Sequence, residues 1–251
     1  LAGPGLQPLA DGRAERAVID YIAGQEWEDV ERMLRVAYLL VKVRETAPRA
    51  MYRREKNRLL PTPDQPLVHI VVEEADTVMK SARLVHIPGE SPMTASAILM
   101  YVTSKGRQYA VQVEQLNQGV TQNKMGNLAT EIKDSTTRRA AFHTSSRMMG
   151  QWALPDGVDT KVFDTSKLPE NCHYMTNGRD AEPMQAKTAY VSETHDIPEA
   201  AIRHQTWVTT LEPYAQTQLV RLLGKDYAGD YADRWSYERT QSWRDYFGEF
   251  P

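Results

Sequence analysis

The 251-residue sequence predicts an α/β protein in which a mostly parallel sheet is flanked by helices and followed by a helical C-terminal tail. Three observations support this prediction: a helix-periodic segment from Glu26, strand-like runs separated by helical stretches from Leu67 onward, and a change of character after Pro198. Strands that alternate with helical segments are typical of parallel α/β sheets. We therefore expect a core over residues 1–197 and an aromatic-rich helical tail over residues 198–251.

The first long helix is predicted by apolar residues that recur at the spacing of one helix face. They are Val30, Met33, Leu34, Ala37, Tyr38 and Val41. Acidic residues crowd the start of this helix and basic residues its end, as the helix dipole favours. Further basic residues follow: Arg49, Arg53, Arg54, Lys56 and Arg58. Such a cluster can contact phosphates, but a solvated helix end is the commoner structure, and it is the one we expect here.

The strands of the predicted sheet follow three prolines that end the helical pattern. The first strand spans Leu67–Val72, and helices are expected over Ala75–Leu84 and Ala95–Ser104. A second strand, which alternates from Tyr109, ends near Gln115. Later strands are expected at Arg139–Thr144, Cys172–Thr176 and Lys187–Val191. Beyond Pro198 we expect two helices whose Trp and Tyr side chains pack on the core or on a neighbouring subunit.

Charge and cysteine content limit the class of protein. Thirty basic and thirty-three acidic residues give a net charge of −3, so no overall positive field attracts nucleic acid and any DNA contact must be local. Cys172 is the single cysteine, which excludes an internal disulfide and suits a reducing compartment. No apolar run is long enough to span a bilayer and no signal peptide is recognised. We therefore expect a cytoplasmic protein with no membrane segment in this chain.

Two adjacent carboxylates, Glu73 and Glu74, follow the first predicted strand directly. In an open α/β sheet, chemistry collects at the carboxyl ends of the strands. A carboxylate at this position, Glu73, can hold Mg²⁺, and the next one, Glu74, can orient or deprotonate the water that attacks a γ-phosphate. The alternative is that both acids simply favour the positive end of the following helix.

Two further segments carry candidate functional side chains. Gln115 ends the second predicted strand, and its amide can donate to a phosphate oxygen and accept from the attacking water. Arg138 and Arg139 lead into the third strand, from which an arginine can reach the nucleotide of a neighbouring subunit. A surface ion pair or a DNA phosphate contact are the alternatives for these arginines.

In this order and spacing, the segments resemble the FtsK/SpoIIIE family of double-stranded DNA translocases, within the HerA-FtsK group. IVVEEADTVM is similar to the Walker B strand, KGRQYAVQVEQLNQG to the strand that ends in the glutamine sensor, and TTRRAAFHTSS to the segment with the subunit-bridging arginine. WEDVERMLRVAYLLVKVRE resembles the long helix that precedes Walker B. The resemblance covers about residues 27–191.

The resemblance implies a RecA-like P-loop NTPase core that binds ATP and Mg²⁺ between the subunits of a hexameric ring, with double-stranded DNA in the central channel. It places the catalytic roles on Glu73, Glu74, Gln115 and Arg139, with Glu73 as the metal ligand. Lys124 and Arg107 are the candidate contacts to DNA phosphates.

The sequence also departs from the family pattern. Glu73 stands where the family usually has Asp, and Gln151 falls near a second family arginine. No G-x-x-x-x-G-K-[ST] motif occurs, and GKD at residues 224–226 does not qualify. Either a P-loop precedes Leu1 in a longer motor, which we expect, or the chain is a complete degenerate subunit. We predict that the parent protein hydrolyses ATP and that this chain alone does not.

Two other functions remain open from the sequence. The first is a non-catalytic interaction subunit, in which a degenerate RecA-like domain and its aromatic tail dock a partner. The second is a conjugative coupling or secretion ATPase, whose cargo is protein rather than duplex DNA. Other kinds of site find little support, because the six histidines show no pairing at metal-ligand spacing and no G-x-S-x-G elbow is present.

Overall fold

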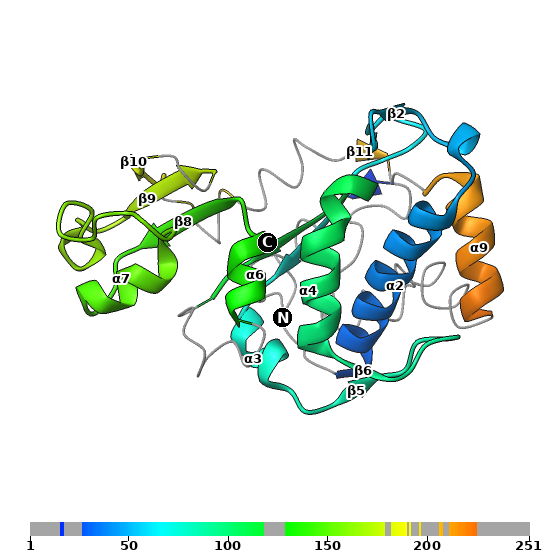
Figure 1. Cartoon of the computed structure of the whole chain (residues 1–251), viewed down its shortest axis with the longest axis horizontal. Coiled ribbons are helices and arrows are strands. Elements are labelled where there is room, and N and C mark those ends of the chain that lie inside the picture. Colours follow the sequence, from blue (N-terminus) through cyan, green and yellow to red (C-terminus); the bar gives the residue numbers. More distant parts are fainter. Residues whose placement is uncertain are drawn as a thin grey trace.

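The structure of the protein is a computed structural model, which describes residues 16–17, 27–117, 129–178, 182–189, 191, 196, 206–207 and 211–224. Figure 1 shows a parallel strand pair (β4 and β7) covered by helices, and a second, antiparallel sheet (β8, β9 and β10) to one side of it. Four helices lie in a row across the covered face, in the order α6, α4, α2 and α9. None of the helices in these ranges is long and apolar enough to span a membrane.

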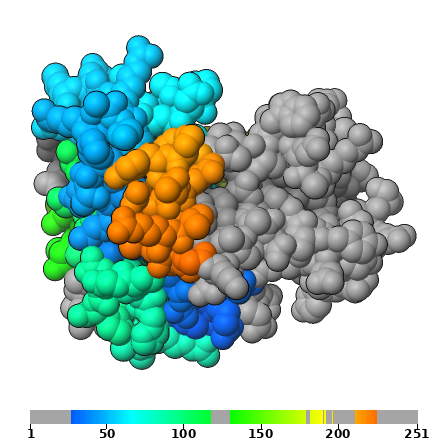
Figure 2. Space-filling view, turned by 90° about the vertical axis from the view of Figure 1, so that its right-hand side faces the viewer, coloured from blue at the N-terminus to red at the C-terminus, as the bar shows by residue number. Residues whose placement is uncertain are grey.

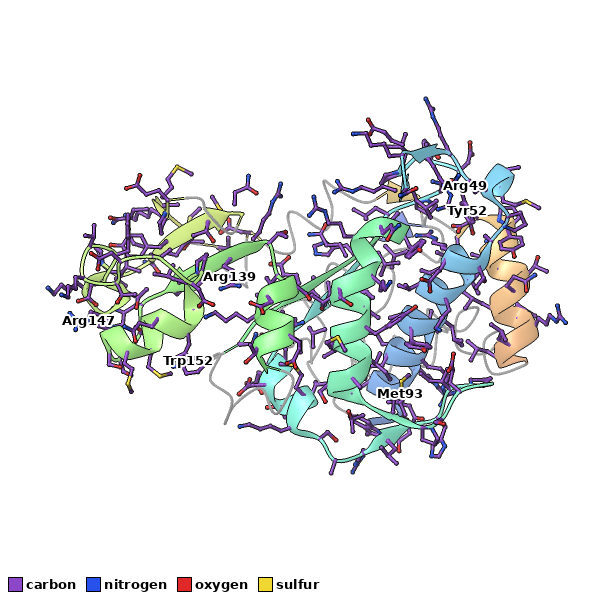
Figure 3. The ribbon with its side chains drawn as sticks, in the orientation of Figure 1. Arg49, Tyr52, Met93, Arg139, Arg147 and Trp152 are labelled. Carbon is purple, nitrogen blue, oxygen red and sulfur yellow. The ribbon has the colours of Figure 1, made fainter. Side chains whose placement is uncertain are left out.

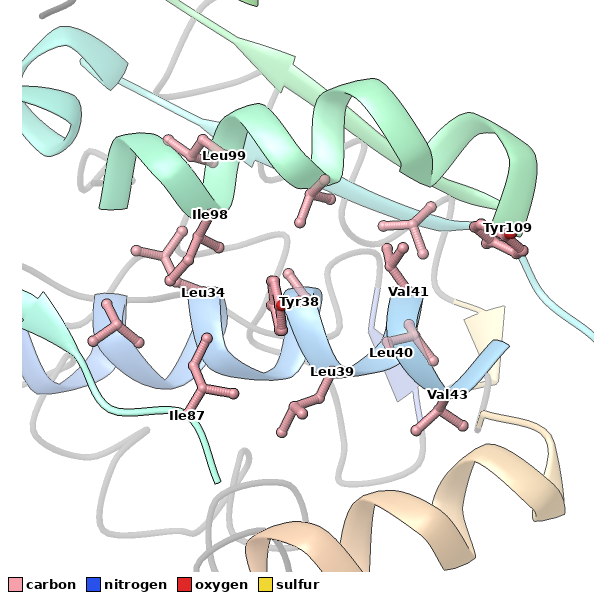
Figure 4. Packing of buried hydrophobic residues seen from close by; sticks show 14 of the residues in the cluster. Leu34, Tyr38, Leu39, Leu40, Val41, Val43, Ile87, Ile98, Leu99 and Tyr109 are labelled. Atoms are coloured by element: carbon pink, nitrogen blue, oxygen red, sulfur yellow. The ribbon is translucent and has the colours of Figure 1, made fainter. Parts of the chain in front are cut away.

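Helix α2 (Trp27–Thr46) confirms the first predicted helix and forms the centre of the hydrophobic core. Its second half is buried on two sides, because α4 (Ala95–Lys105) packs on one side and α9 (Pro213–Leu223) on the other. In Figure 4, Leu34 and Val41 point toward α4 and its neighbours, whereas Leu39 and Val43 point toward α9. The space-filling view shows α9 (orange) on the surface of the molecule (Figure 2).

Strands β4 (Val68–Val72) and β7 (Val111–Gln115) pair in parallel, with Val68 opposite Val111 and Val72 opposite Gln115. The connection between them passes through α3, α4 and the 3-10 helix η3 (Gly106–Tyr109). Thr94 caps α4 by accepting a hydrogen bond from the Ala97 amide. Both predicted strands are confirmed, and their parallel direction is the one that the α/β pattern indicates.

Helix α3 (Ala75–Lys80) is shorter than the predicted Ala75–Leu84. The chain leaves the helix at Ser81, whose backbone is extended. Leu84 and Val85 instead form β5 (Leu84–Val85), which pairs antiparallel with β6 (Met93–Thr94). Leu84, at the end of the predicted helix, is therefore part of a strand.

The second sheet has the order β10-β9-β8 and antiparallel pairing throughout. Its strands are β8 (Arg138–Phe142), β9 (Cys172–Asn177) and β10 (Met184–Lys187). Helix α6 (Ala129–Ser135) precedes it, and α7 (Arg147–Ala153) and η4 (Thr165–Lys167) pack together after β8. The strand expected at Lys187–Val191 was wrong in position, because β10 starts at Met184, opposite Met175, and ends at Lys187, opposite Cys172.

The basic segment after α2 is not the solvated helix end that we expected. It forms a 3-10 turn, η2 (Arg49–Met51), and then a hairpin of β2 (Arg54–Glu55) and β3 (Arg58–Leu59). The two residues between β2 and β3 are Lys56 and Asn57, and Lys56 adopts the left-handed conformation with a φ of 56°. A two-residue loop with positive φ is the usual way to close such a hairpin.

The C-terminal part of the described chain joins the same core. Leu211, Ala215, Leu219 and Leu223 are buried with α2, and β11 (Thr206–Trp207) pairs antiparallel with β1 (Arg16–Ala17). The boundary at residue 197 remains a prediction. The aromatic residues expected beyond Gly224 lie outside the described residues.

Candidate functional site

The carboxyl ends of β4 and β7 lie side by side and are tied together by backbone hydrogen bonds. The Leu116 amide donates to the Val72 carbonyl oxygen at 2.9 Å, and the Ala75 amide donates to the Leu116 carbonyl oxygen at 3.0 Å. Glu73 and Glu74, which lie between Val72 and Ala75, are therefore held beside the end of β7. The parallel arrangement predicted for these segments is confirmed.

Glu74 has an unusual backbone at the junction of β4 and α3. Its φ of 47° and ψ of 45° lie in the left-handed region, and its carbonyl accepts from the Thr77 amide at 2.8 Å. A non-glycine residue in this region costs about 1–2 kcal/mol and often marks a functional position. Glu73 is half-buried and Glu74 is exposed.

Gln115 is fixed at one end of its carboxamide and lacks a partner at the other. Its Nε2 donates to Thr103 Oγ1 on α4 at 3.2 Å. Its Oε1 is buried and has no hydrogen-bond partner among the described residues, and the same holds for Oδ1 of Asn117, two residues further on. An unsatisfied buried acceptor costs about 1–3 kcal/mol, so two of them at the end of β7 indicate a place where a further hydrogen-bond donor fits.

The two carboxylates at this sheet end match the number that Mg²⁺ usually takes from a protein. In the described part of the chain, no group of three or more His, Cys, Asp or Glu residues is placed to hold a metal ion. Mg²⁺ is usually bound by one or two carboxylates together with waters and substrate phosphates. Glu73 and Glu74 supply that number of carboxylates.

Arg139 lies on β8, outside the parallel pair, and its guanidinium holds two helix ends together. Nη1 donates to the Leu154 carbonyl oxygen just after α7 at 3.1 Å, and Nη2 donates to the Lys133 carbonyl oxygen on α6. Figure 3 shows Arg139 in this region together with Trp152. Arg139 therefore has a structural task within its own chain, and its predicted role at a neighbouring subunit's nucleotide remains a prediction.

An ion pair supports the same junction. Lys133 Nζ lies 2.6 Å from Asp156 Oδ1 and 5.7 Å from the centre of the Trp152 ring. The hydrogen bond from Lys133 and its charge lower the pKa of the Asp156 carboxyl, and the charge of Arg139 adds to the effect. These contacts connect α6 to the segment that follows α7.

Of the two candidate DNA contacts, only Arg107 lies among the described residues. It is exposed on η3, at the amino end of β7, and η3 packs against β3. Lys124 lies outside the described residues, and its predicted role stays a prediction.

Sequence reasoning missed a buried network at the amino ends of both parallel strands. Arg44, which is fully buried, donates to the carbonyl oxygens of Pro66, Tyr109 and Ala110 at 2.9–3.0 Å. Its Nε and Nη2 also donate to the two carboxylate oxygens of Glu212, each at 2.8 Å. Tyr52 donates to the same carboxylate at 2.8 Å, and burial together with this bond raises the pKa of its hydroxyl. Nothing in the sequence links residues 168 positions apart.

Comparisons with known proteins agree with the fold. No protein-family model and no curated protein matches the chain. Among solved structures, the cytoplasmic domain of the Thermomonospora curvata type VII secretion ATPase EccC is similar, with a TM-score of 0.54 and 17% identity over 75% of this chain. The pCW3 conjugation coupling protein TcpA, in its monomer form with ATPγS, has a TM-score of 0.48 and 14% identity over 71% of this chain.

The chain spans 21% of the EccC chain and 49% of the TcpA chain. Identity this low establishes the fold alone. The likeness to the EccC domain thus confirms the fold class predicted from the sequence, a mixed α/β fold with a parallel sheet flanked by helices.

Proposed function

We propose that this chain is part of an ATP-hydrolysing motor of the FtsK/SpoIIIE kind and supplies its Walker B, sensor and arginine elements. One observation carries the proposal. Glu73 and Glu74 follow β4 directly beside the end of the parallel β7, where the buried carboxamide oxygens of Gln115 and Asn117 have no hydrogen-bond donor among the described residues. This combination of acids and amides suits the hydrolysis of a phosphoanhydride.

Each residue has a distinct task in this proposal. Gln115 Oε1 accepts a hydrogen bond from the attacking water, while Nε2 keeps its hydrogen bond to Thr103 Oγ1. Glu74 accepts the proton that the water loses, and Glu73 is the metal ligand. Mg²⁺, when bound with ATP, neutralises charge on the phosphates. The left-handed backbone of Glu74 turns the chain so that both acids stay at the sheet end.

The subunit-bridging arginine belongs to the same proposal. Arg139 bonds two carbonyl oxygens of its own chain, so a role at a neighbouring nucleotide requires release of those bonds. Arg138, exposed on the same strand and bonded to Asn177, is the alternative residue for this role. Arg138→Ala should lower only turnover in the assembled motor, whereas Arg139→Ala should also lower the stability of the β8–β10 region.

The proposed cargo is double-stranded DNA, in a hexameric cytoplasmic ring, as the sequence motifs imply. A second candidate is a secretion or coupling ATPase that moves protein, since a solved structure with a similar fold is that of a type VII secretion ATPase, EccC. DNA-stimulated ATP turnover by the natural full-length protein supports the first candidate. Turnover that responds to a protein substrate and not to duplex DNA supports the second.

The catalytic proposal is tested with Glu74→Gln in the natural full-length protein. We expect kcat for ATP hydrolysis to fall by about 100-fold or more, because the proton acceptor is removed, while ATP binding is retained. Glu114→Gln is the matched control: Glu114 is exposed on β7 and pairs with His69 at 3.2 Å, so turnover should stay within about twofold. If Glu74→Gln leaves kcat unchanged, or the wild type neither binds nor hydrolyses ATP, the non-catalytic interaction subunit replaces this proposal.

A further inference from the structure

The segment 49–58 concentrates positive charge in a chain that is otherwise acidic. Its five basic residues outnumber its single acid, Glu55, so the segment carries a charge of +4 and the remaining 241 residues carry −7. Figure 3 shows Arg49 and Tyr52 at the end of α2 from which the hairpin projects. A local basic surface on an acidic molecule is the pattern expected of a polyanion contact.

The hairpin is braced rather than loose. Gln65, which is only 5% exposed, accepts a hydrogen bond from the Arg53 amide at 3.0 Å. Its Nε2 donates to the carbonyl oxygens of Arg53 at 3.0 Å and Leu60 at 2.7 Å. A further backbone bond runs from the Leu60 amide to the Arg53 carbonyl oxygen. The side chain of Gln65 thus fixes both legs of the hairpin.

Buried residues anchor the hairpin to the core. Tyr52 and Leu59, one on each leg, are 6% and 3% exposed, and Arg54 donates to the Arg44 carbonyl oxygen at 3.3 Å. The remaining basic side chains of the segment face solvent: Arg49, Arg53, Lys56 and Arg58. Rigid placement lowers the entropy that these side chains and their backbone lose when they bind a partner.

Arg107 belongs to this surface, although it lies about fifty residues further along the sequence. It is exposed on η3, which packs against β3 of the hairpin. We call Arg49, Arg53, Lys56, Arg58 and Arg107 the basic platform. The platform lies at the amino ends of β4 and β7, whereas Glu73, Glu74 and Gln115 lie at their carboxyl ends.

We propose that the basic platform binds the phosphate backbone of duplex DNA without sequence preference. Four of its five members are arginines, whose planar fork matches phosphate oxygens. The aromatic residue of the segment, Tyr52, is buried and bonded to Glu212, so it offers no face for stacking on unpaired bases. A two-stranded hairpin that presents arginines fits the groove and backbone of a duplex. The inference rests on the proposed function only for the choice of DNA as the polyanion.

The test measures binding of a fluorescent duplex of about 30 base pairs to this chain by anisotropy, between about 50 and 200 mM salt. We expect Arg53→Glu/Lys56→Glu/Arg58→Glu to lower affinity at least tenfold and to flatten the salt dependence by about two to three units of slope. The matched control is Lys161→Glu/Lys167→Glu/Lys187→Glu, which makes the same charge change at exposed lysines outside the platform. Its affinity should fall by less than threefold, and Arg107→Glu alone should weaken binding several-fold.

Folding and alternative ligands are controlled separately. The neutral variant Arg53→Gln/Lys56→Gln/Arg58→Gln should also weaken binding while its thermal unfolding stays close to wild type. Equal losses in platform and control variants would overturn the proposal, as would tighter binding to single strands or to vesicles of anionic lipid than to the duplex. No nucleotide is present in this assay, so its outcome does not depend on whether the chain takes part in ATP hydrolysis.

Discussion

Arg44 links the two strands of the parallel pair by hydrogen bonds at their amino ends. The carbonyl groups that it holds belong to Pro66, shortly before β4, and to Tyr109 and Ala110, directly before β7. Its charge is balanced by Glu212 and is fully removed from water. Because a shift of one strand by a residue would break these bonds, Arg44 helps to set the register that brings Gln115 level with Val72.

Loss of the Glu212 charge should be costly. Glu212→Gln keeps the size of the side chain but leaves the Arg44 guanidinium buried without a counter-charge, so we expect the free energy of unfolding to fall by about 3–5 kcal/mol. Urea unfolding measures this change. Glu170→Gln, at an exposed glutamate, is the control and should change the free energy by less than about 0.5 kcal/mol.

A double variant tests whether the loss of stability comes from the unpaired charge of Arg44. Arg44→Met/Glu212→Leu replaces the pair by apolar residues and should recover part of the stability that Glu212→Gln loses, since no unpaired charge then remains. A Glu212→Gln variant as stable as the wild type would show that Arg44 is satisfied by the three carbonyl groups alone.

At the candidate site, the sequence predicted those features that depend on residues close together in the chain. Glu73 and Glu74 follow a run of strand formers, and Gln115 ends an alternating segment, so their places at strand ends could be inferred from local pattern. The bond from Gln115 to Thr103 could not be inferred, because it depends on how α4 packs over β7. The ion pair of Arg44 and Glu212 could not be predicted for the same reason, because it forms only when α9 packs against α2.

At the scale of elements, α9 is a core helix. It is amphipathic, begins with Pro213 at its first turn and buries Ala215, Leu219 and Leu223 against α2. The N-cap position of α9 is Glu212, so the helix and the buried ion pair are fixed by the same turn. Removal of α9 would uncover apolar residues of α2 and also break the network around Arg44.

Adjacent positions on α9 allow a matched test. Leu219→Ala should lower the free energy of unfolding by about 2–5 kcal/mol, because Leu219 is fully buried. Val220→Ala removes apolar atoms from a residue that is 45% exposed and should cost less than about 1 kcal/mol. Chemical denaturation of both variants measures the difference. Equal small effects would mean that α9 contributes little to the core.

Element boundaries were predicted less well than element types. Helices α2 and α4 and strands β4, β7, β8 and β9 appear close to their expected ranges. Helix α3 is shorter and β10 lies earlier than expected, since pairing of β5 with β6 and of β10 with β9 decides where they end. The basic segment was misjudged because the brace from Gln65 that folds it into a hairpin is not visible as a local pattern.

At the scale of the whole molecule, the parallel pair β4 and β7 and the three-stranded antiparallel sheet have different support. Strands β4 and β7 pair only with each other among the described residues, and their outer face leaves Val71 50% exposed. The antiparallel sheet likewise leaves Phe142 50% and Met184 61% exposed. Parallel sheets are normally covered on both faces, whereas the outer face of the parallel pair is exposed at His69, Val71, Gln112 and Glu114. It is therefore a mixed polar and apolar surface that faces solvent.

The two sheets should open independently. The contacts of α6 with the antiparallel part include the bonds from Arg139 and the Lys133 ion pair, whereas the parallel pair shares one core with α2, α4 and α9. In native-state hydrogen exchange at low denaturant, amides of β8–β10 should exchange before those of β4 and β7. Arg139→Ala should speed exchange in the antiparallel part by about tenfold or more and leave β4 nearly unchanged.

Arg138→Ala provides the control for this measurement, because Arg138 is exposed and bonds only Asn177 among the contacts described above. It should leave exchange in both sheets close to wild type. Uniform exchange across the two sheets, or a response of β4 to Arg139→Ala equal to that of β8, would indicate a single cooperative unit.

The bond from the Ala75 amide to the Leu116 carbonyl oxygen couples the position of the first turn of α3 to the end of β7. If the polypeptide around Gln115 and Asn117 retreats by a fraction of an ångström when it loses a contact, Glu74 and the helix behind it are pulled the same way. A change in the contacts of Gln115 or Asn117 would then move α3 directly, without rearrangement of any residue in between.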